Sequence, residues 1–432
     1  MPSAILRPRD TIMASTAEPS LAATSAARAS PFLSALFLVF ACLTILRVGL
    51  NPLMLDLAVN YTADRGSIIE KLHPALYGFA GIAVVGLLCF RVTLDAWEVR
   101  VVRAMMAFII GIVTLILLTT LAGRGGNAGF LIDTYAGACC CALLFLFPHS
   151  WRNAVGQALI CWLVLSGLVG LVEFGLKVRL QPFSETEHAF RPVGLNAHPL
   201  DLGLWMAVAI SFCAVTDWSG RSKLGVCAVL VLALGASGAR FALIVGLVSA
   251  VPLALGAVGA GQSSRKRLER RIIALAGAFV LVPLVVGALY AAGALSRFEA
   301  GLDDSNARAR VAIYNVFDYL SWQDMLLGTD IAQVRKIALE RLRLEYIESS
   351  LVIFVIQFGV LGTLLFAGLF AWLLRVLLVG AKPAVLLGTL VFFTVILSSN
   401  GLTSKGSSIF LLMTLIIAFR PVQRRTQRAV TR

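Results

Sequence analysis

Long apolar segments alternate with short polar ones along this chain from residue 31 onward. A helix that crosses the hydrocarbon core of a bilayer needs about 20 mostly apolar residues, and its backbone groups bond within the helix. The apolar segments lie near 31–50, 73–90, 104–122, 129–148, 154–176, 199–216, 223–239, 241–260, 272–295, 347–374, 383–399 and 406–420. Their residues do not alternate between apolar and polar, as the strands of a membrane barrel do. We therefore predict an all-α, polytopic integral membrane protein with about twelve transmembrane helices.

Composition supports a membrane location and argues against a nucleic-acid-binding protein. Hydrophobic residues make up 59% of the chain and charged residues 14%, and the mean hydropathy is +0.88. The net charge of +14 would by itself suggest a nucleic-acid partner. If the N-terminus is cytoplasmic, however, the basic excess falls on the cytoplasmic loops and tails, for example at 265–271 and 420–432, as the positive-inside rule describes. We therefore predict that both termini are cytoplasmic and that the protein binds no nucleic acid.

The sequence predicts one membrane domain, 31–420, between two tails. Residues 1–30 are rich in Ala, Ser, Thr and Pro, which indicates a disordered cytoplasmic tail, and 421–432 form a basic cytoplasmic tail. All eight cysteines lie within apolar segments and have no spaced polar partner, so neither disulfides nor a metal site are indicated. A glycine-rich phosphate loop is also missing from the sequence. We expect neither a metal nor another cofactor.

Three polar segments stand out on the outer side of the membrane. They are 177–198, the tight turn at Arg240, and 296–346, the large loop between predicted helices 9 and 10. Long loops between packed helices are commonly functional. Residues 331–344 of the longest segment have the spacing of an amphipathic helix, which we expect to lie on the membrane interface.

Arg240 is the most unusual charge in the sequence. It separates the apolar segments 223–239 and 241–260, within a turn too short to carry the guanidinium far from the bilayer. Charges at membrane depth usually face a cavity or a partner, whereas arginines in long loops commonly bind lipid headgroups alone. We therefore predict a functional role for Arg240.

Arginine-bearing segments that converge on one membrane face would form a pocket for a polyanion. Arginine binds phosphate through two parallel hydrogen bonds and stays charged, and a lipid-linked pyrophosphate is the polyanion expected there. Glu348, at the start of the tenth apolar segment, is a candidate general base for an acceptor hydroxyl. Helix capping is an equally good interpretation of Glu348. His198, which precedes Pro199, either contributes to the site or caps the sixth helix.

Four segments in the chain after about residue 150 resemble the O-antigen ligase and polymerase superfamily, bacterial integral-membrane glycosyltransferases that use undecaprenyl-pyrophosphate-linked glycans. Each segment is similar to a family motif in the same order along the chain. The segments are Arg191–Leu200 before a span, Ser237–Phe241 at a serine-arginine turn, Arg310 with Tyr314 and Leu327-Gly328 at the start of the large periplasmic loop, and Glu348–Gly362 at the start of the next span. Ligases of the family usually carry a histidine where this chain has Glu348, and this departure favours polymerisation over ligation.

The resemblance implies a polymerase that joins lipid-linked polysaccharide repeat units at the periplasmic face of the bacterial inner membrane, for exopolysaccharide, capsule or O-antigen. It implies that Arg191, Arg240 and Arg310 hold the pyrophosphate, that His198 helps to bind substrate, and that Glu348 accepts the acceptor proton. The implied partners are the undecaprenyl-pyrophosphate-linked oligosaccharide, the lipid bilayer, and a chain-length regulator and a flippase of the same pathway.

Two alternatives stay open at this point. One is ligase-type transfer of a finished glycan to an acceptor. The other is a polytopic transporter or lipid-linked glycan flippase, whose substrate site would lie near the midplane between broken helices. The apolar segments contain few midplane charges, and the polar residues gather on one face, which disfavours transport.

Overall fold

The computed structural model describes residues 31–62, 67, 69–123, 128–181, 190–257, 287, 290, 311–344, 347 and 349–421. Every regular element in these ranges is a helix, so the predicted all-α class is confirmed for them. The elements are α1 (Pro31–Gly49), α2 (Pro52–Asp56), α3 (Pro74–Cys89), α4 (Ala96–Leu121), α5 (Ala128–Phe130), η2 (Leu131–Ala136), η3 (Gly137–Leu146), α6 (His149–Leu176), α7 (Pro199–Cys213), α8 (Gly220–Ala236), α9 (Arg240–Ala257), η4 (Ile313–Tyr319), α13 (Trp322–Leu327), α14 (Ile331–Leu342), α15 (Ser350–Leu378), α16 (Pro383–Ile396) and α17 (Ser408–Ala418).

Four of these helices are long and apolar enough to cross a membrane: α1, α4, α6 and α15, with 19, 26, 28 and 29 residues. Other strongly apolar helices are shorter, such as α7 with 15 residues and α17 with 11. Eleven of the twelve predicted apolar segments coincide with helical structure, and the ninth, 272–295, lies almost wholly outside the described residues. The structure therefore supports a membrane protein, while the count of twelve spans and the periplasmic position of the large loop stay predictions.

Several helices begin where a capping side chain is followed by proline. His73 and His198 precede α3 and α7, and in each case Nδ1 accepts a hydrogen bond from the amide two residues on, at 3.1 and 3.0 Å. Proline suits the first helical position because the N–H that it lacks would have no partner within the helix. The two histidines are thus part of the local signals that start these helices.

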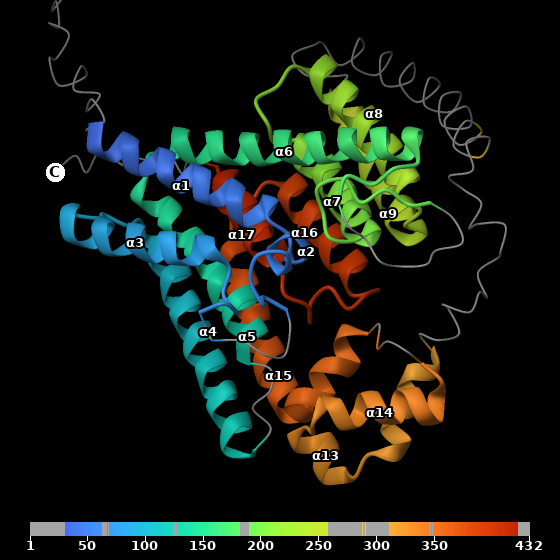
Figure 1. Cartoon of the computed structure of the whole chain (residues 1–432). Coiled ribbons are helices and arrows are strands. Elements are labelled where there is room, and N and C mark those ends of the chain that lie inside the picture. The colour runs from blue at the N-terminus through green and yellow to red at the C-terminus, as the bar shows by residue number, and fades with distance from the viewer. Residues whose placement is uncertain are drawn as a thin grey trace, which may run out of the picture.

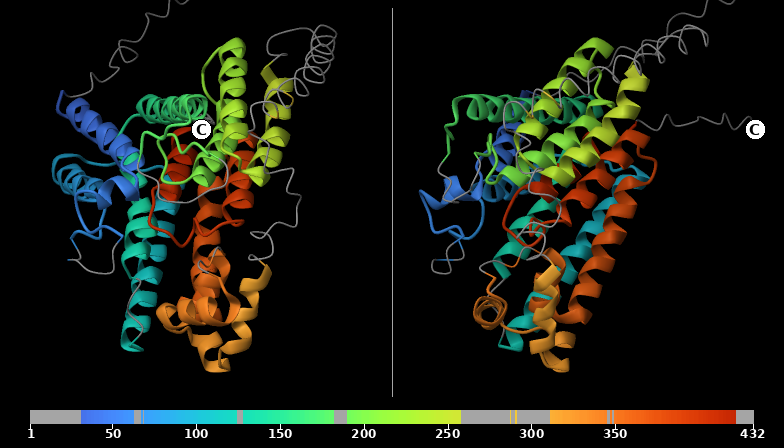
Figure 2. Two further views of the ribbon diagram at one scale, coloured as in Figure 1. Left: turned by 45° about the vertical axis from the view of Figure 1, so that its right-hand side comes forward. Right: turned by 90° about the vertical axis from the view of Figure 1, so that its right-hand side faces the viewer.

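The helices form two differently oriented groups. α4 and α15 lie side by side and run steeply in Figure 1, while α1, α3 and α6 run across the same view. α7 packs against α8, α9 and α16, and α6 lies across this group. Figure 2 shows that the α13 and α14 segment lies at one end of the molecule, at the level of the C-terminal end of α4.

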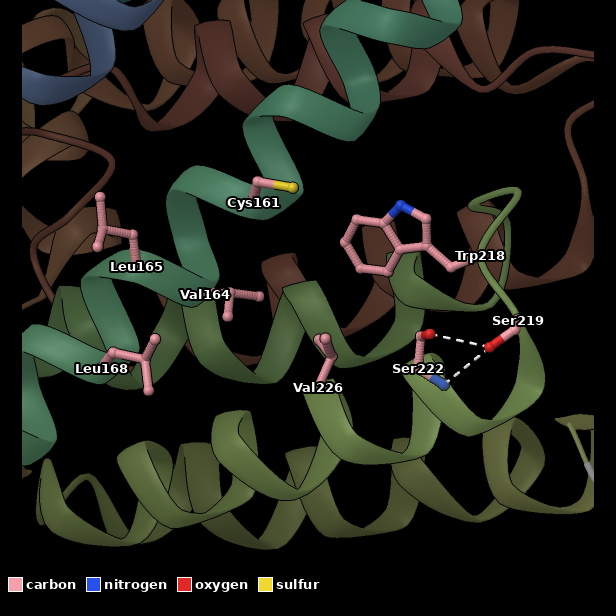
Figure 3. Close-up of a pocket in the computed structure, with 8 residues that line it drawn as sticks. All are labelled: Cys161, Val164, Leu165, Leu168, Trp218, Ser219, Ser222 and Val226. Atoms are coloured by element: carbon pink, nitrogen blue, oxygen red, sulfur yellow. Dashed lines mark hydrogen bonds between the residues drawn. The ribbon is translucent and has the colours of Figure 1, made fainter.

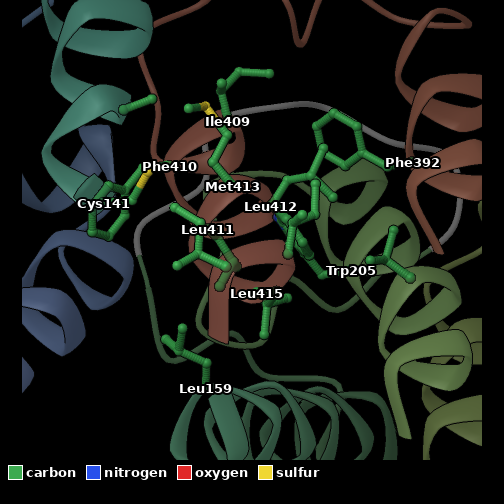
Figure 4. Close-up of a cluster of buried hydrophobic side chains, with 14 of the residues drawn as sticks. Cys141, Leu159, Trp205, Phe392, Ile409, Phe410, Leu411, Leu412, Met413 and Leu415 are labelled. Carbon is green, nitrogen blue, oxygen red and sulfur yellow. The ribbon is translucent and has the colours of Figure 1, made fainter. Parts of the chain in front are cut away.

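The centre of the molecule is occupied by α17, although it is only 11 residues long. Every side chain from Ile409 to Ala418 is buried. Leu159 of α6, Trp205 of α7 and Phe392 of α16 lie around it (Figure 4). A helix that is apolar on all sides and enclosed by other helices contributes its whole surface to packing.

A second, smaller core joins residues 311–344, called the loop segment below, to α15. Ile313 and Val316 of η4, Val334 and Ala338 of α14, and the first turns of α15 bury their side chains together. The prediction that residues 331–344 form a helix is confirmed by α14. The apolar side of α14 covers this core, so protein rather than lipid packs on that side, and the position of α14 relative to the membrane stays a prediction. Packing against protein has the same amphipathic signature as packing against lipid.

The predicted span 129–148 also differs from a regular α-helix. It consists of the short α5, the π-helical η2 and the 3-10 helical η3. Single π-helical turns often accompany functional or strained positions. Here the π-helical turn contains Asp133, which is fully buried, so the irregular backbone coincides with a buried charge.

Candidate functional site

The turn before Arg240 is built by three small residues between α8 and α9. Ser237 caps α8, with Oγ donating to the Leu234 carbonyl at 2.7 Å, and Gly238 adopts a φ of 65°, a conformation that favours glycine. Ala239 packs so tightly against α7 that a Cβ on Gly203 would lie 2.5 Å from its Cβ. Arg240 is then the first residue of α9, and it is half-buried. The turn is therefore fixed on the scaffold and holds the backbone of Arg240 in place.

Arg191 lies against this turn. Its side chain is 5% exposed, and its Nε donates to the Ser237 carbonyl at 2.9 Å. A Cβ added to Gly238 would lie 3.3 Å from the same nitrogen, so Arg191 packs closely on this glycine. Two of the predicted arginine segments, which are 46 residues apart in the sequence, thus meet in the structure.

Glu173, which the sequence analysis did not single out, organises the segment that carries Arg191. Its carboxylate is 1% exposed and accepts hydrogen bonds from the backbone amides of Leu180, Val193 and Gly194, at 2.9, 2.8 and 2.8 Å. Bonds from amides to an ionised acceptor are roughly twice as strong as neutral ones. The signal was available in the sequence, because Glu173 is the one charged residue in the apolar segment 154–176.

Ser166 of the same helix adds a second attachment. Its Oγ accepts hydrogen bonds from the Leu195 amide at 3.1 Å and from Nδ2 of Asn196 at 2.9 Å. Gly194, with a φ of 59°, packs on this serine, since a Cβ there would lie 2.5 Å from the Ser166 carbonyl oxygen. α6 therefore fixes the segment 191–196 by two side chains, Ser166 and Glu173, that lie about two turns apart.

The structure shows His198 in the capping role that the sequence left open. Its Nδ1 accepts the hydrogen bond from the Leu200 amide at the start of α7. A contribution of His198 to substrate binding stays a prediction.

Glu348 and Arg310 lie outside the described residues, so their side chains are not placed. Ser350, two residues after Glu348, is hydrogen-bonded to the connection between α16 and α17. Ser350 donates from Oγ to the Ser399 carbonyl at 2.8 Å and accepts from the Leu402 amide at 3.2 Å. This connection fixes the start of α15.

The remaining two motif segments meet at a pair of glycines. Gly359 interrupts α15 with a φ of 69°, and a Cβ there would lie 2.1 Å from the Leu326 carbonyl oxygen. Gly328 has a φ of 89°, and a Cβ there would lie 2.6 Å from the Gln357 carbonyl oxygen. The Thr329 amide donates to the Ile356 carbonyl at 2.6 Å. The end of α13 thus lies backbone to backbone against the break in α15.

A buried charged cluster, which the sequence analysis also missed, joins the N-terminal helices to the segment before α17. Arg47 and Asp133 form an ion pair at 2.8 Å, with side chains 1% and 0% exposed. The Asp133 carboxylate also accepts from the Tyr61 hydroxyl at 2.6 Å and from the His73 amide at 2.7 Å. Burial and the neighbouring carboxylate raise the pKa of Tyr61 well above its usual range, so the phenol stays a hydrogen-bond donor. Lys405 donates to the Tyr61 carbonyl at 2.5 Å.

Two cavities lie away from the turn of residues 237–240, called the arginine turn below. One, of about 540 Å³, opens between α6 and α8 and is lined mainly by apolar side chains, among them Val164, Leu168 and Trp218 (Figure 3). The other, of about 160 Å³, lies at the start of α4 and is lined by Trp97, Glu98 and others. Neither contains Arg191 or Arg240 in its lining. Among the described residues, no group of three or more His, Cys, Asp or Glu side chains could hold a metal ion.

Comparison of the chain with protein-family models, with curated proteins and with solved structures finds no match. The class that the structure defines is therefore a helical protein with four helices able to cross a membrane and a tightly built arginine turn.

Proposed function

We propose that this protein is a polysaccharide polymerase of the bacterial inner membrane. It joins repeat units linked to undecaprenyl pyrophosphate at the periplasmic face, and transfers the growing glycan from one carrier to the sugar of a second carrier. This proposal rests on the resemblance of four segments, and the structure contributes the way in which these segments meet.

The observation that carries the proposal is the contact of Arg191 with the turn before Arg240. Both belong to motif segments, and the bond from Arg191 Nε to the Ser237 carbonyl brings the segments together on rigid elements. The other two motif segments meet at Gly328 and Gly359. The four segments therefore meet as two pairs, one at the turn before Arg240 and one at the break in α15. The proposal requires both pairs to serve one substrate.

In the proposed mechanism, the arginines bind the pyrophosphate and stabilise the charge that develops on it as the glycosidic bond to the carrier breaks. Guanidinium groups suit this task because they remain charged and offer paired donors to phosphate oxygens. Arg310 belongs to the same group, and Glu348 accepts the proton of the attacking hydroxyl. His198 supports the segment of Arg191 through its cap on α7.

The test is the glycan profile of a deletion strain that carries wild type, Arg240→Ala or Arg221→Ala at equal protein levels. Arg221 is the matched control, because it is an exposed arginine at the other end of α8. Loss of one charge-stabilising donor typically slows a reaction by about 10²-fold or more. We expect Arg240→Ala to accumulate single repeat units on the carrier, and Arg221→Ala to make normal polymer. Normal polymer length and amount from Arg240→Ala would exclude the pyrophosphate role.

One structural observation favours the transporter or flippase as the second candidate. The π-helical and 3-10 segment around Asp133 and the break in α15 at Gly359 are interruptions of apolar helices, which transporters use at their substrate sites. The deletion strains described above distinguish a flippase from a polymerase, because a flippase defect would leave the lipid-linked precursor on the cytoplasmic face. Long polymer held on the carrier but missing from its final acceptor would indicate a ligase.

A further inference from the structure

The short helix α13 presents an exposed apolar face that no described part of the chain covers. Trp322 is 78% exposed, and Leu326, four residues on and therefore on the same side of the helix, is 43% exposed. Tyr319, at the end of η4, is 50% exposed. None of the residues of α13 is buried. A tryptophan, a tyrosine and a leucine exposed together are uncommon on a surface that faces only water.

The position of α13 along the axis of α4 indicates the environment of this exposed face. α4 and α15 pack antiparallel, with a Cβ on Gly111 facing Leu369 and one on Gly362 facing Leu115. Because the helices are antiparallel, three residues further along α4 correspond to three residues earlier in α15. Leu118 of α4 therefore lies level with Gly359, where α13 contacts α15. α13 therefore lies at the level of the last turns of α4.

Those last turns of α4 carry an exposed apolar surface. Leu117, Leu118 and Leu121 are 56%, 57% and 84% exposed, on a helix long and apolar enough to cross a membrane. Figure 2 shows the α13 and α14 segment and the C-terminal end of α4 at the same end of the molecule in both views. Where such leucines meet the end of a span, the surroundings change from hydrocarbon to headgroups, which is the depth that Trp and Tyr prefer.

We propose that α13, together with Tyr319, inserts into the headgroup region of the bilayer and anchors the loop segment 311–344 to the membrane surface. Arg335, Lys336 and Arg341 of α14 are exposed in the same loop segment, and they attract anionic phospholipid headgroups. The interfacial element of the loop is thus α13, whereas the apolar side of α14 is used in the second core. This inference is independent of the proposed polymerase activity, and it requires only that α4 spans the membrane.

The docking of α13 explains why its exposed side chains can be held at a fixed depth. The backbone contact at Gly328 and Gly359, with the Thr329 amide bonded to the Ile356 carbonyl, attaches the helix to α15 without a long linker. A capping box of Ser321 and Asp324 starts α13 directly before Trp322. The indole is therefore set by the spanning helix rather than by a free loop.

The experiment is fluorescence quenching of the purified full-length protein in liposomes of phosphatidylcholine and phosphatidylglycerol. The difference between wild type and Trp322→Phe isolates one indole among the seven in the chain. We expect this difference signal to be quenched by phospholipids brominated on their acyl chains and to be protected from aqueous iodide. Trp372→Phe gives the matched lipid-facing reference, because Trp372 is 43% exposed within α15.

Two results would overturn the proposal. Quenching of the Trp322 signal by iodide, with no effect of brominated lipid, would mean that α13 faces water. Protection from both quenchers, while Trp372 still responds to brominated lipid, would mean that protein covers the face. Unchanged thermal unfolding of Trp322→Phe shows that the variant is folded, and stronger lipid quenching at a higher phosphatidylglycerol fraction supports the role of the basic residues of α14.

Discussion

Two buried arginines show two different uses of charge in this protein. Arg47 meets the carboxylate of Asp133, so that one charged side chain neutralises another inside the helical core. Arg191 bonds the Ser237 carbonyl, and the nearby Glu173 binds three backbone amides. In the first region the charges hold helices together, whereas in the second they hold connecting segments in a fixed conformation. A fixed backbone that carries guanidinium groups is what an anion site needs, and this difference points to the arginine turn rather than to the ion pair.

The largest expected effect comes from breaking the ion pair. Asp133→Asn leaves the buried Arg47 guanidinium without its countercharge, which should lower the free energy of unfolding by about 3–5 kcal/mol. Thermal unfolding in detergent measures this loss. Lys336→Ala is the matched control, because its pair with Glu340 is exposed and should contribute less than about 1 kcal/mol. Equal melting temperatures for Asp133→Asn and wild type would show that the pair contributes nothing to stability.

The next largest effect concerns the attachment of the loop segment. In Gly359→Ala the new methyl group would collide with the Leu326 carbonyl at a φ that disfavours alanine, which should cost about 2–4 kcal/mol. Gly368→Ala lies in the same helix with nothing within 4 Å of the added carbon, so it should be neutral or slightly stabilising. Protease sensitivity of α13 and thermal unfolding report on both variants. If the two glycines tolerate alanine equally, the backbone contact is not tight.

Glu173→Gln tests the second region directly. The amide cannot accept all three backbone hydrogen bonds as an ionised carboxylate does, so we expect a loss of about 1.5–3 kcal/mol. Because the segment of Arg191 loses its attachment, polymer should fall as well. Glu340→Gln, which changes an exposed glutamate, serves as the control in both measurements. Wild-type polymer from a destabilised Glu173→Gln protein would separate the scaffold from the activity.

The smallest expected effect is at His198. His198→Ala removes the cap of α7 and should cost about 1 kcal/mol, while His198→Asn keeps an acceptor for the Leu200 amide. Comparison of the polymer made by the two variants distinguishes capping from substrate binding. Activity that returns with asparagine indicates a cap alone, and activity lost in both supports the predicted contact with substrate.

The sequence predicted the helical class well because apolar segments of span length have few other solutions. The distribution of charge over alternate loops also predicted that the segments of Arg191 and Arg240 lie on one membrane face. The structure shows the two segments in contact, and the membrane face that they occupy stays a prediction. The sequence did not identify Glu173 or the pair of Arg47 and Asp133, because their partners are backbone amides or residues 86 positions apart. The sequence also could not assign what packs on the apolar side of α14, since an amphipathic pattern does not say whether protein or lipid covers that side.

The enclosed position of α17 has a consequence for the order of assembly. Helices inserted during synthesis enter the bilayer in chain order, and α17 is the last helix among the described residues. Its partners include η3 and α6, which are made far earlier, yet they meet across the space that α17 fills. The side chains of η3 and α6 that pack on α17 therefore have no partner there until the last described helix is made. A chain that ends before Ser408 would lack the centre of its core, so we expect it to lose the packing of both the early and the late helices rather than one local contact.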